Sequence, residues 1–104
     1  MTTPFNIEHC HSMDDVRRNI DALDARIVAL IAERGGYVAQ AARIKQRADQ
    51  IVDLDRVEFI VDRVRAQAST LGAPESVLEA TYRAMIGAFI EYERGEFERL
   101  HQEG

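Results

Sequence analysis

Three basic residues, Arg17, Arg34 and Lys45, lie in one long amphipathic segment, at positions where a helix normally places apolar or neutral side chains. On an α-helix, Arg34 and Lys45 would share a face about 16 Å apart along the axis, so their long side chains can converge on one small anion. Arg17 would lie about 42 Å from Lys45, which is too far for both side chains to reach one ligand. If all three bind one molecule, Arg17 must come from a second, antiparallel copy. The spacing therefore predicts an obligate homodimer.

The segment that carries these residues has the pattern of one long helix. Ser12, followed by two aspartates, is typical of a helix N-terminus, and apolar residues then recur at helical spacing as far as about Gln46. Gly35 and Gly36 would each cost about 1 kcal/mol relative to alanine, so a break there is the alternative. The apolar register continues past them without a shift, which favours a single helix. Its apolar residues are Val16, Ile20, Leu23, Ile27, Leu30, Ile31, Val38, Ala41, Ala42 and Ile44.

Two shorter helices are predicted after a polar connection over residues 46–53. Asp53 can cap a helix from Leu54 to about Ser69, and Gly72 can end it. A third helix follows Pro74. The residues expected on the inner faces are Phe59, Ile60, Val64 and Ala68 in the second helix, and Val77, Leu78, Thr81, Tyr82, Met85, Ile86, Phe89 and Ile90 in the third. With no alternating strand pattern, the predicted class is all-α with three helices, the first much the longest.

Length and charge narrow the function further. A chain of 104 residues is one domain with a small core, which self-association would help to stabilise. We expect a loosely held tail over residues 1–11 and a helical domain over residues 12–104. The net charge of −5 argues against nucleic acid as a partner, because domains that bind phosphate backbones are usually basic. The buried-face cations therefore indicate a small anionic ligand.

Cysteine use and hydropathy indicate the compartment. The single cysteine, Cys10, cannot form an internal disulfide, and no stretch is long and apolar enough for a signal peptide or a membrane span. The cytoplasm is the default expectation, without a membrane partner. His9, Cys10 and His11 are adjacent, whereas structural zinc sites use separated pairs of ligands, so no metal is expected there.

Four motifs occur in order along the chain: Asp14 to Asp24, Glu33 to Lys45, Asp55 to Glu58, and Tyr82 to Glu93. Together they resemble the all-helical chorismate mutases and the closely related isochorismate-pyruvate lyases. The resemblance covers residues 12 to about 98. It implies an intertwined all-α homodimer that converts chorismate to prephenate in aromatic amino-acid biosynthesis, without a metal or a cofactor.

The resemblance also implies roles for the basic residues. Arg34 and the partner's Arg17 would clamp the two carboxylates of chorismate, because a guanidinium group matches a carboxylate in shape and charge. Lys45 would donate to the ether oxygen and to one carboxylate. Arg56 would add positive field near the ring, and Asp53 would contribute a contact to the hydroxyl group.

Glu93 is an acidic residue that extends the apolar stripe of the third helix. By resemblance it makes the second contact to the ether oxygen, where other members carry glutamine or glutamate. A carboxyl group can donate a hydrogen bond only when it is protonated. We therefore expect activity to fall as the pH rises through the titration of Glu93.

One position departs from the mutase pattern. Many mutases carry a glutamate in the first turn of the second helix, which holds the substrate hydroxyl, and Val57 occupies that place here, as an apolar residue does in the lyases. A shift of the alignment by one residue would bring Glu58 nearer. An isochorismate-pyruvate lyase is therefore the alternative enzyme, and a non-catalytic helical dimer that binds a small dianion is the alternative from another class.

Ordinary surface roles are the competing interpretation for the charged residues. Arg17 and Arg34 could form ion pairs with acidic neighbours on the first helix, and Lys45 could simply offset the helix dipole. Glu93 could pair with Arg94 or Arg83. His101, near the end of the chain, is expected to be solvated. The acidic neighbours are Asp21, Asp24 and Glu33.

Overall fold

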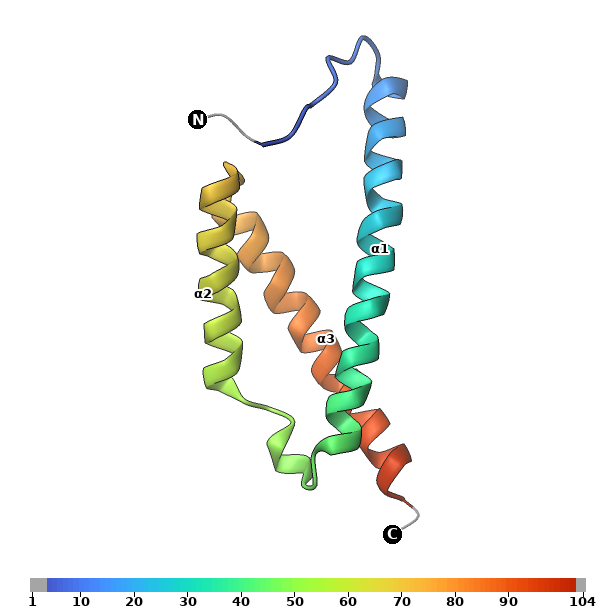
Figure 1. Ribbon diagram of the computed structural model, residues 1–104, viewed down its shortest axis with the longest axis vertical. Helices are drawn as coiled ribbons and strands as arrows, with labels where there is room; N and C mark the ends of the chain where they lie inside the picture. The colour runs from blue at the N-terminus through green and yellow to red at the C-terminus, as the bar shows by residue number, and fades with distance from the viewer. Residues whose placement is uncertain (1–3, 103–104) are drawn as a thin grey trace.

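The computed structural model describes residues 4–102, and its regular structure is entirely helical (Figure 1). Helix α1 covers Met13–Ile44, a short 3-10 helix η1 covers Ala48–Gln50, α2 covers Leu54–Leu71, and α3 covers Glu75–His101. No strand occurs in this part of the chain, so the predicted all-α class with three α-helices is confirmed. None of these helices is both long and apolar enough to cross a membrane.

The predicted start and continuity of α1 are confirmed. Ser12 caps the helix, because its hydroxyl oxygen accepts a hydrogen bond from the Asp15 backbone N–H at 3.2 Å. The helix runs through Gly35 and Gly36 without a break and ends at Ile44, two residues before the predicted limit. The apolar register was therefore a better guide than the low helix propensity of the two glycines.

Capping residues also define α2. The Asp53 carboxylate accepts a hydrogen bond from the Arg56 backbone N–H at 3.0 Å, as predicted for an N-cap. The helix extends to Leu71, two residues beyond the predicted end. Gly72 then stops it with φ 73°, a left-handed conformation that glycine adopts without strain.

Helix α3 packs against both α1 and α2, and it crosses α1 near the C-terminal end of that helix (Figure 1). The close approach depends on Gly35, where a β-carbon would lie 3.1 Å from Cε1 of Phe89. The buried apolar residues are Ala42, Ile51, Val61, Val64, Ala68 and Ile86. The core therefore lies around the C-terminal part of α1 and the facing sides of α2 and α3.

Three expectations about inner faces were wrong. Phe59 is 54% exposed, and the inner face of α2 is centred on Val61 instead, which is 1% exposed. The exposed Phe59 ring lies beside Arg56, whose guanidinium carbon is 5.3 Å from the ring centre. In α3, Val77 and Thr81 are exposed, and the Thr81 hydroxyl donates to the Val77 carbonyl at 2.7 Å rather than packing in the core.

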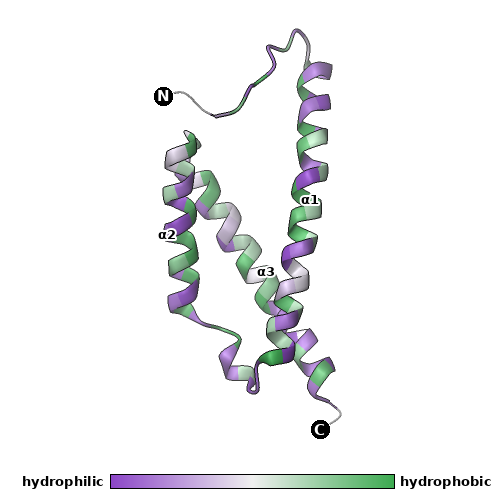
Figure 2. Ribbon diagram, in the orientation of Figure 1, coloured by the Kyte–Doolittle hydropathy of each residue, from purple (hydrophilic) through white to green (hydrophobic). Residues whose placement is uncertain are grey.

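The N-terminal half of α1 differs from the rest of the molecule. Every residue from 20 to 33 is exposed, and this half lies away from α2 and α3 in Figure 1. Figure 2 shows that hydrophobic segments nevertheless recur along it. The exposed apolar residues of this stretch are Ile20, Leu23, Ile27, Val28, Leu30 and Ile31.

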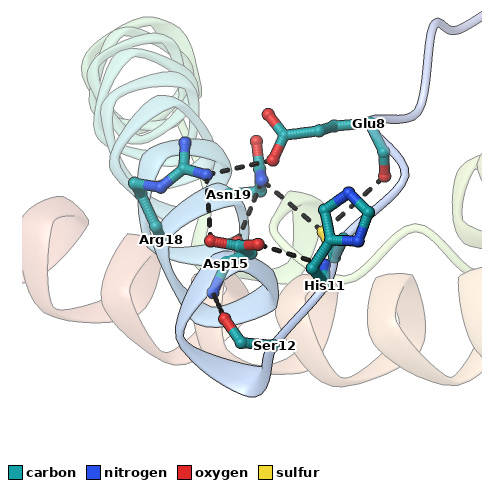
Figure 3. Close-up of polar contacts among 7 residues, drawn as sticks. Glu8, His11, Ser12, Asp15, Arg18 and Asn19 are labelled. Carbon is teal, nitrogen blue, oxygen red and sulfur yellow. Dashed lines mark hydrogen bonds and ion pairs between the residues drawn. The ribbon is translucent and has the colours of Figure 1, made fainter.

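Part of the N-terminal tail, within residues 8–11, contacts the start of α1 through exposed polar groups (Figure 3). The Arg18 guanidinium lies between the Glu8 carboxylate at 3.0 Å and the Asp15 carboxylate at 3.6 Å. Asp15 also accepts from the His11 backbone N–H at 3.0 Å. This hydrogen bond and the Arg18 charge lower the pKa of Asp15. The predicted division into residues 1–11 and 12–104 includes residues 1–3 and 103–104, which lie outside the described residues.

Candidate active site

A cavity of about 300 Å³ lies between the C-terminal part of α1, the connection to α2, the start of α2 and the middle of α3. Five charged residues line it together with apolar side chains such as Ile86 and Phe89. The charged residues are Arg34, Lys45, Asp53, Arg56 and Glu93. All five were predicted as site residues. Three cations against two carboxylates give the cavity a positive formal balance, which favours an anionic ligand.

Lys45 and Glu93 form the central ion pair of this cavity. The Lys45 Nζ donates to Glu93 Oε2 at 2.7 Å, and the two side chains are 27% and 9% exposed. Among the described residues, Glu93 is the charged residue that is buried, and Lys45 is its ion-pair partner. Its expected alternative partners bind other groups, since Arg94 pairs with Glu91.

The chain around Lys45 is held by contacts on both sides. The backbone N–H of Lys45 donates to the Ala41 carbonyl at 2.9 Å, which closes the last turn of α1. Nε2 of His101 lies 3.2 Å from the carbonyl oxygen of Ala42, a residue with no exposed surface. His101 also stacks on Phe97. His101 is exposed, as expected, but its ring also reaches a buried carbonyl near the end of α1.

Arg34 reaches the cavity beside an aromatic ring. Its guanidinium carbon lies 5.3 Å from the centre of the Phe89 ring, within the range of a cation–π interaction. The absence of a side chain at Gly35 lets Phe89 approach α1 this closely. Arg34 makes no ion pair among residues 4–102, so its charge is available to a ligand. The expected alternative, a pair with Glu33 or another acidic neighbour, is not formed.

The match to known proteins agrees with this arrangement. The chorismate mutase type II family matches residues 16–94, which include Arg17, Arg34, Lys45, Arg56 and Glu93. The chain belongs to this family. It is similar to a curated chorismate mutase of Methanocaldococcus jannaschii, with 34% identity over 73 residues that cover 69% of this chain and 74% of that protein.

Val57 is the position at which this family member departs from the mutase pattern, and the structure shows its surroundings. Val57 lines the cavity and presents an apolar side chain to it. Glu58 does not line it, because both of its carboxylate oxygens accept hydrogen bonds from Arg83, at 2.8 and 3.0 Å. These hydrogen bonds from Arg83 lower the pKa of Glu58. The suggestion that Glu58 could replace the missing glutamate is therefore not supported.

Arg17 is the predicted site residue that this chorismate mutase family member does not bring to the cavity. It is exposed near the start of α1, whereas Arg34 and Lys45 lie towards the other end of the same helix. Within the described part of the chain it forms no ion pair, including with Asp21 or Asp24. A single copy therefore assembles every predicted site residue except this one.

Residues near the cavity that the sequence analysis missed include Gln50, His101 and Ile51, which lines the cavity and is 5% exposed. Gln50 lines the cavity and lies in a connection that carried no signal beyond its polarity. His101 contacts α1 from the far end of α3, a contact that helical periodicity does not encode. Among residues 4–102, no group of three or more histidine, cysteine or acidic side chains is placed to hold a metal ion.

Proposed function

We propose that this member of the chorismate mutase family binds chorismate in the cavity and rearranges it to prephenate, in aromatic amino-acid biosynthesis. The observation that carries the proposal is the Lys45–Glu93 pair at 2.7 Å in a cavity that also contains Arg34 and Arg56. Chorismate has two carboxylates, an ether oxygen and one ring hydroxyl. The negative charge of chorismate complements the cations of the cavity, and its ether oxygen can accept hydrogen bonds from Lys45 and Glu93.

The reaction is a pericyclic rearrangement, so no covalent intermediate is required. An enzyme accelerates it by holding the reactive conformer and by stabilising the negative charge that develops on the ether oxygen. In our proposal Arg34 binds a substrate carboxylate, and Lys45 donates to the ether oxygen and to a carboxylate. Arg56 adds positive field near the ring, and Asp53 at the start of α2 contributes a contact to the hydroxyl. All of these groups line the cavity in the substrate-free structure, which supports the proposal because little movement would be needed to reach a bound substrate.

Glu93 would make the second contact to the ether oxygen. Without substrate, its carboxylate accepts from Lys45. As a donor it must be protonated, so in this proposal kcat/KM falls as the pH rises. Glu93→Gln supplies an amide donor at every pH, and its profile should not show this fall. Glu96→Gln removes the same charge from α3 outside the cavity and should keep the native profile. A flat native profile would contradict this role.

The complete site requires a homodimer in this proposal. Arg17 would enter the partner's cavity and bind the second carboxylate, as the distance along α1 requires. The exposed apolar stretch of α1 supports the proposal, because large exposed apolar patches usually mark association surfaces. A site that draws on both chains would be active only in the dimer. An active monomer would exclude the shared site.

The deciding experiment supplies purified protein with chorismate or isochorismate in separate reactions and identifies the products. Efficient formation of prephenate from chorismate, with little salicylate from isochorismate, supports the mutase. Salicylate and pyruvate as the efficient products would instead establish a lyase, for which the apolar Val57 in the cavity is the favouring observation. Turnover of neither would favour a non-catalytic dimer that binds a small dianion.

Two further predictions from the sequence, the cellular location and the domain boundary, need their own tests. The cytoplasmic location is tested by cell fractionation with an antibody against the native protein. The boundary between a tail over residues 1–11 and a domain over residues 12–104 is tested by limited proteolysis.

A further inference from the structure

Gln50 is the neutral hydrogen-bonding side chain among the described residues that line the cavity. It belongs to η1, in the connection that leads from Lys45 at the end of α1 to Asp53 at the start of α2. The other polar groups of the cavity carry full charges. A neutral polar group is therefore the exception in a site built from cations, carboxylates and apolar side chains.

Hydrogen bonds fix which way the Gln50 amide faces. Its Oε1 accepts from the backbone N–H of Gln46 at 3.0 Å and from that of Arg47 at 3.1 Å. Both partners are donors, so the oxygen must face them and the amide nitrogen must point away. Nε2 forms no hydrogen bond within residues 4–102. The side chain thus presents a pre-oriented donor that the protein itself does not use.

The charges of the cavity indicate which substrate atom this donor serves. Arginine and lysine groups suit the carboxylates, because charge-assisted hydrogen bonds are the strongest available there. Val57 offers no hydrogen bond, and the Asp53 carboxylate, which would contact the hydroxyl in the proposed function, can accept from it but cannot donate to it. We propose that Nε2 of Gln50 donates a hydrogen bond to the ring hydroxyl of chorismate and so makes the site selective for that group. This inference rests on the proposed mutase function.

The test compares two substrates in one variant. Gln50→Glu keeps an oxygen for the Gln46 and Arg47 N–H groups but removes the donor. The substrates are chorismate and its 4-deoxy analogue, which lacks the ring hydroxyl and keeps both carboxylates and the ether. We expect the preference for chorismate, as a ratio of kcat/KM values, to fall about three- to tenfold in the variant. Folding losses and the added charge act on both substrates and cancel in the ratio.

Gln67→Glu is the matched control, because it makes the same change on an exposed part of α2 that does not line the cavity. It should leave the ratio unchanged. Gln50→Met, which lacks the donor and any strong acceptor, should lower the ratio at least as far as Gln50→Glu, whose second carboxylate oxygen can accept from the hydroxyl. An equal loss of kcat/KM on both substrates would overturn the inference, because Gln50 would then only support the loop. An unchanged ratio with no loss of kcat/KM would also overturn it. Native protein that turns over chorismate retains the proposed function in either case, whereas native protein that does not would end both proposals.

Discussion

The two halves of α1 have the same apolar spacing but different surroundings. The C-terminal half packs against α3, where Ala42 is fully buried and Gly35 lets Phe89 approach closely. From the N-terminal half into the middle of the helix, every residue from 20 to 33 is exposed, although apolar residues continue the same stripe. A helix with an apolar face is stabilised mainly by covering that face. One half is therefore covered within the chain, and in the proposed dimer a second copy would cover the other.

The site residues divide in the same way. Arg34 and Lys45 of the C-terminal half reach the cavity, and Arg17 of the N-terminal half does not. The exposed part of α1 thus also belongs to the half that carries Arg17, the proposed site residue that lies outside the cavity. A single antiparallel association would supply both.

The largest expected effect comes from substitutions of Arg17 and Lys45, at the two ends of α1. Arg17→Ala and Lys45→Ala should each lower kcat/KM by about 10²- to 10³-fold, because each removes a pre-oriented donor. Mixed dimers of the two variants would contain one site with neither change, so activity should return when the variants are refolded together. Steady-state kinetics on the mixture checks this. Failure of the mixture to recover, with dimers present, would show that Arg17 acts in its own chain or outside the site.

Dimer formation itself should depend on the stripe and not on exposed apolar residues in general. Ile27 is 50% exposed and lies on the stripe, while its neighbour Val28 is 66% exposed and lies about 100° round the helix. We expect Ile27→Asp to weaken dimerisation at least tenfold and to lower activity in parallel, because dimer formation would desolvate a charge on the stripe. Val28→Asp is the matched control and should remain dimeric. Sedimentation equilibrium measures both, and an equal response of the two variants would contradict the assignment of the interface.

The two adjacent glycines give a smaller effect, measured as stability. A β-carbon at Gly36 would meet no atom within 4 Å, so Gly36→Ala should raise the free energy of unfolding by about 0.5–1 kcal/mol. Gly35→Ala should gain less and should raise KM, because the Phe89 ring beside Arg34 would have to move. Urea unfolding at one fixed protein concentration compares them. Equal gains in stability would show that the approach of α3 does not depend on Gly35.

The smallest effect concerns the contacts that hold the tail to the start of α1. The pKa of Asp15 is lowered by the His11 backbone N–H and by Arg18. Its stabilising contribution is therefore present above the unfolded pKa, about 3.9, and is lost as the pH falls through the folded value. Asp15→Asn should destabilise at pH 7, and the difference from native should close below about pH 4. Asp14→Asn is the control, since Asp14 makes none of these contacts. A difference that persists unchanged in acid would contradict this origin.

Much of the fold could be predicted because its signals are local. Ser12, Asp53 and Gly72 each mark a helix limit through a contact with residues at most four positions away. The inner face of α2 was harder, since Phe59 and Val61 are both apolar and only packing against α3 decides which is buried. The site was predicted through the family resemblance and through the unusual placement of Arg34, Lys45 and Glu93 on apolar faces.

The sequence by itself determined the all-α class, the three helices and the set of charged residues that line the cavity. Only the tertiary structure decided how those residues are paired. Lys45 meets Glu93 from a distant helix, Glu58 is held by Arg83 outside the cavity, and Gln50 turns its amide nitrogen away from the backbone. The physical reason is that caps and periodicity depend on neighbours within one turn or two, whereas side-chain partners depend on where distant segments meet in space.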